Sequence, residues 1–217
     1  MPDSTTIIIS CAGRGTRLGM GLPKALIDID GTPLIIRQLQ MLNDYDDIRI
    51  VVGYQMEKVI ETVLSYRKDV MFVFNHDYMN TGTGASFMLG TKFSRKYVVA
   101  IDGDVLVHPA DLTAFIDYNG NCVCGTDPST DNPVLMDTIE REGKEFVTQF
   151  SRESGKYEWT GLMKISSELL GGGTGYVYQL VEHLLPIDML YIRSKEVDTP
   201  DDYNELVRWI KNNYDSD

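Results

Sequence analysis

The fold is decided by residues 7–24, which read Ile7-Ile8-Ile9-Ser10-Cys11-Ala12-Gly13-Arg14-Gly15-Thr16-Arg17-Leu18-Gly19-Met20-Gly21-Leu22-Pro23-Lys24. The stretch begins as an apolar, β-branched run, which is typical of a strand buried on both faces of a sheet. The glycines that follow allow positive φ angles and let the backbone approach a ligand closely. Successive amide N–H groups in such a loop can point at an anion. Because Arg14, Arg17 and Lys24 add positive charge, the stretch predicts a strand that leads into a polyphosphate site.

The composition is that of an acidic globular protein. The chain has 217 residues, a formal net charge of -12 and 43% hydrophobic residues. That length is sufficient for one large domain with its own core. The negative charge argues against general nucleic-acid binding, which needs clustered Lys and Arg, and against anionic membranes. It suits a protein that binds a divalent cation and reserves its few basic residues for an anionic ligand.

Cysteine usage and hydropathy predict a cytoplasmic protein. The three cysteines, Cys11, Cys122 and Cys124, contain no CxxC pair, so we expect neither zinc nor disulfides and infer a reducing compartment. Residues 1–9 show no signal-peptide pattern. No apolar run approaches the roughly 20 residues that a membrane-spanning helix needs.

The first 118 residues alternate between strand and helix patterns. We expect strands at 5–10, 48–52, 70–74 and 97–101, and helices at 34–42, 56–66, 85–93 and 109–117. Thr32 is expected to cap the first helix, with Pro33 in its first turn. This alternation is typical of a doubly wound, mostly parallel sheet.

The pattern changes near residue 120. We expect strands at 122–125, 134–140, 146–150, 160–165 and 189–193, helices at 177–185 and 202–212, and a flexible joint at Gly171–Gly173. The sequence therefore predicts a single α/β domain over residues 1–217. Its Rossmann-like, mostly parallel sheet is flanked by helices in residues 1–118 and continues into a mixed or antiparallel half in residues 119–217.

The glycine loop matches neither of two common phosphate-binding fingerprints. The dinucleotide fingerprint needs a third glycine where Leu18 stands, and the P-loop needs a Gly-Lys-Ser/Thr step that is absent. Ala12-Gly13-Arg14-Gly15-Thr16-Arg17 followed by Pro23-Lys24 instead resembles the signature loop of the nucleotidyltransferases that make sugar nucleotides and related compounds. That family includes sugar-1-phosphate uridylyl- and thymidylyltransferases and phosphocholine cytidylyltransferases.

The resemblance implies a nucleotide-diphospho-sugar transferase-like fold with an NTP-binding half at 1–118 and an acceptor-binding half at 119–217. It also implies Mg²⁺-dependent transfer of a nucleoside monophosphate from an NTP, with CTP or UTP favoured, to a small phosphorylated acceptor. In such enzymes the loop wraps the triphosphate while basic residues neutralise it. By match, Lys24 and Arg17 are expected to be catalytic, and the nucleotide-binding residues of the loop are expected to be Ala12, Gly13, Arg14, Gly15 and Thr16.

Two acidic segments are candidates for the Mg²⁺ site. Asp102-Gly103-Asp104 follows the fourth expected strand, at the carboxyl end, where open α/β sheets bind ligands. Hard carboxylate oxygens there suit Mg²⁺. The second segment is Glu196-Val197-Asp198-Thr199-Pro200-Asp201-Asp202-Tyr203. From the residues alone, each segment can equally be a turn or helix cap with no role in metal binding. The resemblance implies that Asp104 and Asp198 are the metal ligands, whereas Asp102 is assigned to the acceptor.

Residues 81–86 and 158–164 are candidates for contacts to the base and the acceptor. Thr81-Gly82-Thr83-Gly84-Ala85-Ser86 precedes a helix, so it can cap that helix or let a base lie on the backbone with hydroxyls reading its edge. The resemblance assigns Gly82, Thr83 and Ser86 to the nucleotide. Trp159 can stack on a sugar or cover a quaternary ammonium group, and Lys164 can hold the acceptor phosphate. A core tryptophan and a surface lysine are the alternatives.

The acceptor stays open between a phosphocholine-like alcohol or amine phosphate and a sugar 1-phosphate. We expect a monomer or homodimer whose partners are the NTP and the acceptor, with no nucleic acid or membrane partner. The alternative function is an inactive module that binds or senses NTP.

Overall fold

The computed structural model describes residues 4–15, 18–173 and 175–213. A nine-stranded sheet forms its centre. In the order of the sheet, the strands are β5 (Met71–Phe74), β4 (Ile48–Val52), β1 (Thr5–Cys11), β6 (Tyr97–Asp102), β11 (Tyr157–Ser166), β8 (Cys122–Thr126), β12 (Ile187–Tyr191), β10 (Lys144–Ser151) and β9 (Leu135–Arg141). Both expected halves of the chain therefore contribute to one sheet.

The first half of the sheet is parallel. β1 pairs with β4 and β6, and β4 pairs with β5, all in parallel register. β11 then runs antiparallel to β6 and β8. β1 is buried along almost its whole length because its apolar side chains are covered on both faces. The predicted α/β class, with a mostly parallel sheet that continues into a mixed half, is confirmed.

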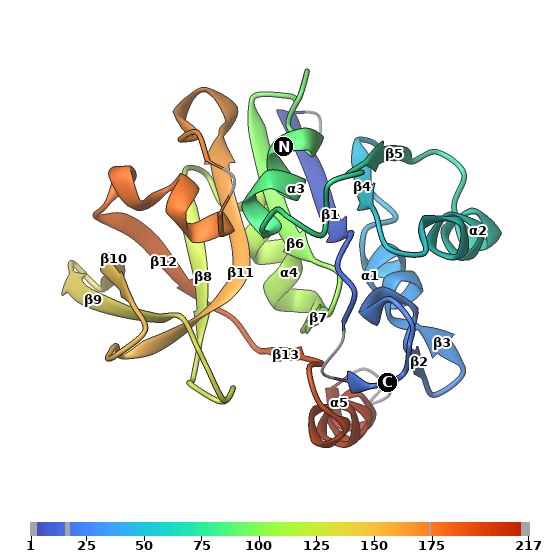
Figure 1. The fold of residues 1–217 in the computed structure, drawn as a ribbon. Coiled ribbons are helices and arrows are strands. Elements are labelled where there is room, and N and C mark those ends of the chain that lie inside the picture. The colour runs from blue at the N-terminus through green and yellow to red at the C-terminus, as the bar shows by residue number, and fades with distance from the viewer. Residues whose placement is uncertain (1–3, 16–17, 174, 214–217) are drawn as a thin grey trace.

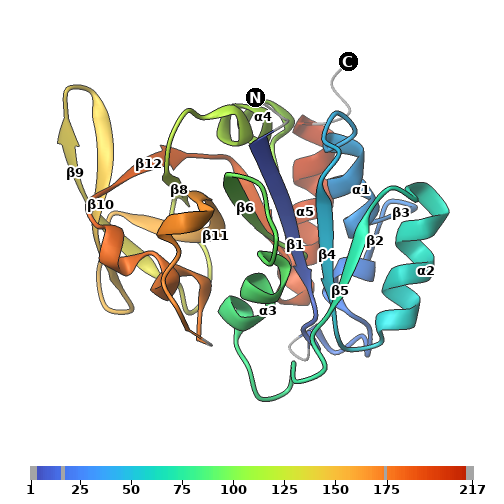
Figure 2. The ribbon, with the colours of Figure 1, turned by 90° about the horizontal axis from the view of Figure 1, so that it is seen from above.

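Helices cover both faces of the sheet (Figures 1 and 2). The α-helices are α1 (Leu34–Met41), α2 (Met56–Tyr66), α3 (Thr83–Gly90), α4 (Pro109–Asp117) and α5 (Pro200–Asn213). The 3₁₀ helices are η3 (Lys24–Leu26), η4 (Ser167–Leu169), η5 (Val177–Leu180) and η6 (Glu182–Leu184). One core lies between the sheet and α1, α2 and α4, and a second core lies between the sheet and α3 and η5.

Two short strand pairs sit beside the main sheet. β2 (Asp28–Ile29) pairs with β3 (Thr32–Pro33), and β7 (Val105–Val107) pairs with β13 (Ser194–Glu196). The β7–β13 pair matters for function because it joins the segment after β6 to the segment before α5. The backbone N–H of Val197 extends this ladder by donating to the Asp104 carbonyl at 3.0 Å. Residues about ninety positions apart in the sequence are thereby neighbours.

Two expected elements are wrong in detail. Thr32 does not cap α1: it pairs with Ile29, and Pro33 takes the N-cap position. The expected helix at 177–185 is instead η5 and η6, because Val181 leaves helical geometry with φ at -123°. The three cysteines are buried and unpaired. Among the described residues, none of the helices has the length and apolar character needed to cross a bilayer.

Candidate active site

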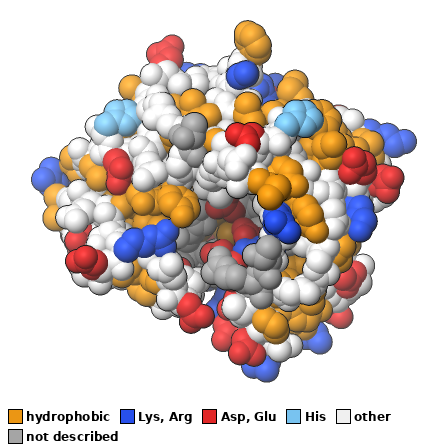
Figure 3. Space-filling view, viewed as in Figure 1, with side chains coloured by type: hydrophobic (Ala, Val, Ile, Leu, Met, Phe, Trp, Pro, Cys, Tyr) orange, Lys and Arg blue, Asp and Glu red, His pale blue; other side chains and the backbone are white. Residues whose placement is uncertain are grey.

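A cleft of about 640 Å³ lies at the carboxyl ends of β1 and β6. Figure 3 shows it as a hollow in the middle of one face, with acidic side chains visible inside. It is bordered by the loop after β1, the N-terminal end of α3, the turn after β6, the start of β11, the segment around η5, and the chain between β13 and α5. This is the edge of an open α/β sheet at which ligands bind.

The glycine loop forms one wall of the cleft. Ala12, Gly13 and Gly15 border it, and a Cβ at Gly13 would have no neighbour within 4 Å. Gly15 has φ at +57°, and a Cβ there would lie 2.7 Å from the Cγ of Lys24. The loop therefore needs glycine at this position both for its backbone conformation and to leave room for the lysine stem. Thr16 and Arg17 lie outside the described residues.

Lys24 reaches from this loop to a group of carboxylates. It begins η3, whose next residue, Ala25, is buried and so anchors the backbone. Its Nζ lies 2.6 Å from Asp104 Oδ2, in hydrogen-bond contact with Asp198 Oδ1, and 3.9 Å from Glu196 Oε1. Burial by itself would lower the pKa of Lys24, but the carboxylates of Asp104 and Asp198 raise it above its usual value.

Three carboxylates surround this ammonium group. Asp104 follows β6, Glu196 ends β13 and Asp198 precedes α5, and one oxygen of each lies within 4.8 Å of the others. Burial, followed by the negative charges of Asp104 and Asp198, raises the pKa of Glu196. Hard oxygen ligands at this separation fit Mg²⁺, which binds carboxylates together with phosphate oxygens and water. Asp202 does not belong to this group of carboxylates. It caps the start of α5, because its Oδ2 accepts the Thr199 N–H at 2.7 Å.

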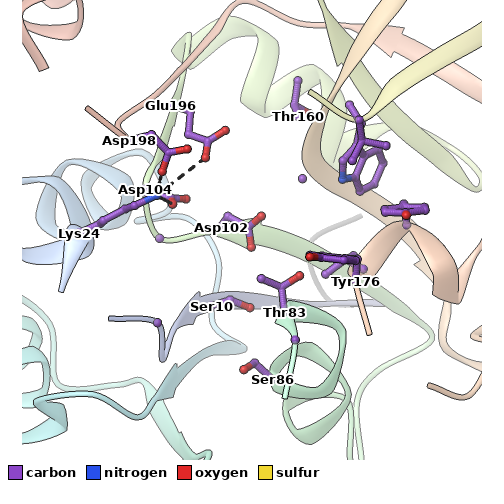
Figure 4. A pocket seen from close by; sticks show the side chains of 18 of the residues that line it. Ser10, Lys24, Thr83, Ser86, Asp102, Asp104, Thr160, Tyr176, Glu196 and Asp198 are labelled. Atoms are coloured by element: carbon purple, nitrogen blue, oxygen red, sulfur yellow. Dashed lines mark hydrogen bonds and ion pairs between the residues drawn. The ribbon is translucent and has the colours of Figure 1, made fainter. Parts of the chain in front are cut away.

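Asp102 lies apart from this group. Its carboxylate borders the cleft near Gly161, whose φ is +82° and whose missing Cβ makes room for it. In Figure 4 it lies between the Lys24 cluster on one side and Tyr176 on the other. Its carboxylate forms no hydrogen bond or ion pair with another described residue, whereas its backbone carbonyl accepts from Gln38 Nε2 at 2.8 Å. Burial, with a smaller contribution from Asp104, raises its pKa above the usual range.

The start of α3 forms the wall expected to hold the base. Gly82, Thr83 and Ser86 all border the cleft. Ser86 is buried, and its Oγ accepts a hydrogen bond from Asn75 Nδ2 at 2.9 Å. The segment is also the start of α3, with Gly82 at the N-cap position and no side-chain cap hydrogen bond. Its assignment to the nucleotide stays a prediction. Tyr78, which the sequence did not single out, lines the same end of the cleft.

Aromatic side chains form the opposite wall. Trp159 borders the cleft and packs edge-on against Phe150, with 5.5 Å between ring centroids. Tyr176 and Tyr178 stack on each other at 6.0 Å, and the Arg152 guanidinium lies 5.6 Å from the centre of the Tyr176 ring. Sequence reasoning singled out Trp159 alone. Tyr176 is the N-cap residue of the 3₁₀ helix η5 and Tyr178 lies within it, so no strand-like or helical pattern in the sequence indicated them.

Two expected site residues lie elsewhere. Lys164 is 3% exposed, and its Nζ donates to the carbonyls of Ile116 at 2.6 Å and Tyr118 at 2.7 Å. The expectation that Lys164 holds the acceptor phosphate is therefore wrong, because β11 turns this side chain toward the end of α4. Arg14 is exposed, lies 5.7 Å from the centre of the Tyr54 ring and does not border the cleft.

Comparison with known proteins places this chain in a family. The family described as "MobA-like NTP transferase domain" matches residues 7–161. The bifunctional protein GlmU of Methanococcus vannielii is 28% identical over 187 residues, which are 82% of this chain and 43% of GlmU. The chain thus spans less than half the length of this curated relative.

Solved structures show the same fold. CTP:phosphocholine cytidylyltransferase (LicC) of Streptococcus pneumoniae matches with a TM-score of 0.77 and 21% identity, over 96% of this chain and 100% of that one. A putative glucose-1-phosphate thymidylyltransferase of Bacillus anthracis has a TM-score of 0.76 and 16% identity, over 94% of this chain and 95% of that one. Because the family pattern covers most of its length, including the glycine loop and the strand ends that form the cleft, the chain belongs to the MobA-like NTP transferase domain family.

Proposed function

We propose that this chain is a Mg²⁺-dependent nucleotidyltransferase, which transfers a nucleoside monophosphate from an NTP to a small phosphorylated acceptor and releases pyrophosphate. One observation carries the proposal: the glycine loop, Lys24 and three carboxylates meet in one cleft. CTP or UTP is the favoured donor. The solved relative named CTP:phosphocholine cytidylyltransferase supports that preference.

The glycine loop, Lys24 and the three carboxylates supply positioning and charge. The open space at Gly13 lets the backbone approach a phosphate, and the loop amides can then donate to its oxygens. The Lys24 ammonium neutralises the negative charge that develops on the phosphates in the transition state. Asp104, Asp198 and Glu196 would hold Mg²⁺, which when bound adds positive charge at the reacting phosphates.

The reaction needs no covalent intermediate with the enzyme. An oxygen of the acceptor phosphate forms a bond to the α-phosphorus while the bond from that phosphorus to the bridging oxygen of pyrophosphate breaks. The electron pair of that bond leaves with pyrophosphate. Because the acceptor phosphate is already ionised, no side chain has to remove a proton from it. Holding both substrates in line within one cleft is therefore the main task of the protein.

The acceptor wall favours a cationic acceptor over a neutral sugar phosphate. Asp102 offers a carboxylate that has no partner among the described residues, and Trp159 and Tyr176 border the same cleft with aromatic rings. Aromatic faces and a carboxylate together attract an ammonium group. Burial raises the pKa of Asp102, so a bound cation would also relieve an unfavourably buried charge. A phosphorylated amino alcohol such as phosphocholine fits this wall.

Pyrophosphate release tests the reaction. CTP, UTP, ATP and GTP are each combined with phosphocholine, phosphoethanolamine and a panel of sugar 1-phosphates, with Mg²⁺ or with EDTA. We expect release with CTP or UTP and an amine-containing acceptor, only in the presence of Mg²⁺. Lys24→Ala should lower this rate by several orders of magnitude while circular dichroism shows an intact fold. Nucleotide binding without pyrophosphate release in every combination would identify an inactive NTP-binding module instead.

The acceptor preference has its own test. 3,3-Dimethylbutyl phosphate has the shape of phosphocholine without its charge, so it isolates the contribution of the cation. We expect the native enzyme to prefer phosphocholine by about tenfold or more in kcat/KM, the scale of a desolvated cation–π contact. Asp102→Asn should remove most of that preference, whereas Asp44→Asn, at an exposed carboxylate outside the cleft, should not. Equal use of both acceptors by the native enzyme would refute the cationic assignment.

A further inference from the structure

The Lys24 ammonium and a divalent cation need the same carboxylate oxygens. The Nζ lies 2.6 Å from Asp104 Oδ2, in direct contact with Asp198 Oδ1, and 3.9 Å from Glu196 Oε1. Mg²⁺ binds such oxygens at about 2.0–2.1 Å. A metal ion on these atoms would therefore lie almost on top of the ammonium group. Two cations at that separation repel each other strongly, so one must leave before the other binds.

We propose that Lys24 is an internal counter-ion, which holds these carboxylates in the free protein and gives them up to the metal when the nucleotide arrives. The ammonium then moves onto the phosphates. The idea rests on the proposed function and deepens it, since it assigns Lys24 two successive partners. It also makes Glu196, which begins the second acidic segment but was not expected to bind the metal, the third ligand.

The geometry gives Lys24 access to both partners. Its stem runs against the glycine loop, because a Cβ at Gly15 would lie 2.7 Å from Lys24 Cγ. Its head meets the carboxylates of Asp104 and Asp198 (Figure 4). A lysine has a flexible four-carbon stem and a compact charged head. A short movement of that head therefore exchanges the carboxylates for a phosphate bound at the loop.

The three carboxylates differ in how tightly Lys24 engages them. The side chains of Asp198 and Asp104 are 9% and 20% exposed and contact the ammonium directly. The side chain of Glu196 is 36% exposed and lies farthest from the ammonium, at 3.9 Å. Glu196 is therefore the most exposed of the three carboxylates and the one that Lys24 engages least.

The exchange couples metal and nucleotide binding. In the free protein the ammonium competes with the metal, so divalent cations bind weakly. A nucleotide removes this competitor, so it tightens metal binding. By linkage, the metal tightens nucleotide binding by the same factor. Removing the ammonium charge should therefore give tight metal binding without any nucleotide.

Mn²⁺ binding followed by electron paramagnetic resonance tests this without any turnover. With no nucleotide present, Lys24→Met should bind Mn²⁺ at least about tenfold more tightly than the native protein, within the range usual for coupled sites. Lys195→Met is the matched control: it removes a lysine charge next to Glu196, but Lys195 pairs with Glu205 at 3.1 Å. That variant should behave like the native protein. Equal Mn²⁺ affinity in the native and Lys24→Met proteins would overturn the proposal.

Thermal unfolding gives a second readout and checks folding. In EDTA, Lys24→Met should melt below the native protein because its carboxylates repel one another. Mn²⁺ should then raise its melting temperature more than that of the native protein, since at a given concentration a ligand stabilises the folded state more when it binds more tightly. Adding Glu196→Gln to Lys24→Met should weaken Mn²⁺ binding again, and an unchanged affinity would remove Glu196 from the ligand set.

These measurements separate the two ideas. If no NTP and acceptor pair releases pyrophosphate but Lys24→Met still gains Mn²⁺ affinity, the proposed reaction fails and the exchange stands. If turnover occurs but Lys24→Met gains no Mn²⁺ affinity, the reaction stands and the exchange fails.

Discussion

Replacing Lys164 with methionine tests whether this lysine stabilises the fold or binds substrate in the cleft. Lys164 and Lys24 are both largely enclosed, but their ammonium groups have different partners. Lys164 Nζ donates to two carbonyls at the end of α4, at 2.6 and 2.7 Å. Methionine retains an unbranched apolar stem of similar size and removes only the charge and the donors. We expect Lys164→Met to destabilise the protein and to leave catalysis intact.

The size of the effect follows from the contacts. Hydrogen bonds from charged groups contribute about 1.5–3 kcal/mol each, so two of them amount to about 3–6 kcal/mol. The cost of burying the Lys164 charge offsets part of this stabilisation. Burial lowers the pKa of Lys164, which shows that the charged form is disfavoured where it lies. We therefore expect the free energy of unfolding to fall by about 2–3 kcal/mol. For a chain of this length, the melting temperature should fall by roughly 4–12 °C.

Urea unfolding followed by far-UV circular dichroism measures the loss, and pyrophosphate release measures KM for the acceptor. Lys156→Met provides the control, because the Lys156 side chain is 56% exposed and pairs only at the surface with Glu145. Its effect on unfolding should be much smaller than that of Lys164→Met, because exposed ion pairs contribute little. A Lys164→Met protein with native stability and an acceptor KM raised about tenfold or more would refute the structural role and return Lys164 to the acceptor.

Three further perturbations test the site and its surroundings. Gly161→Ala places a Cβ against the Asp102 carboxylate, at a residue whose φ is +82°. The substitution should lower the free energy of unfolding by about 1–2 kcal/mol and lower kcat/KM for the acceptor more than for the NTP. Equal losses in kcat/KM for both substrates would contradict this prediction. Gly84→Ala places a Cβ 2.7 Å from a backbone oxygen of the segment before η5, so it should raise KM for both substrates, and unchanged steady-state kinetics would count against this contact. The Arg193 guanidinium donates to Asp111 and holds the pKa of that carboxyl below its usual range, so the pair stabilises the fold above a pH of about 4 and loses this contribution as the pH falls through the lowered pKa. Asp111→Asn should therefore lower the free energy of unfolding by less than about 1 kcal/mol at pH 7. The loss should shrink progressively as the pH falls below about 4, and urea titrations that show an equal loss at neutral and at acid pH would disprove the assignment.

Elements with strong local patterns were predictable. The strand at 48–52 and the helices at 56–66 and 109–117 have the bounds that the sequence indicated. Each is defined by periodic apolar residues and by turn or capping residues within a few positions. The short strands β7 and β13 were not predicted, because three-residue strands carry no periodicity and their pairing joins segments about ninety residues apart.

The candidate site also contains residues that were predictable from the sequence and residues that were not. The glycine loop and the aspartates at the strand ends were visible because their residue types and spacing carry the chemistry. Glu196, Tyr176 and Tyr178 were missed because they reach the cleft through tertiary contacts. Lys164 was misassigned because nothing near it in the sequence shows that β11 turns it toward the carbonyls at the end of α4.

The sequence alone therefore determined that the chain begins with a buried strand and a phosphate-binding type of loop, and that carboxylates follow its strands. Those properties depend on residue type and on neighbours a few positions away. The tertiary structure alone decided which charges meet. Lys24 faces three carboxylates and Lys164 faces two carbonyls, because the partners of each lysine lie tens of residues away and are brought to it only by the pairing of the strands.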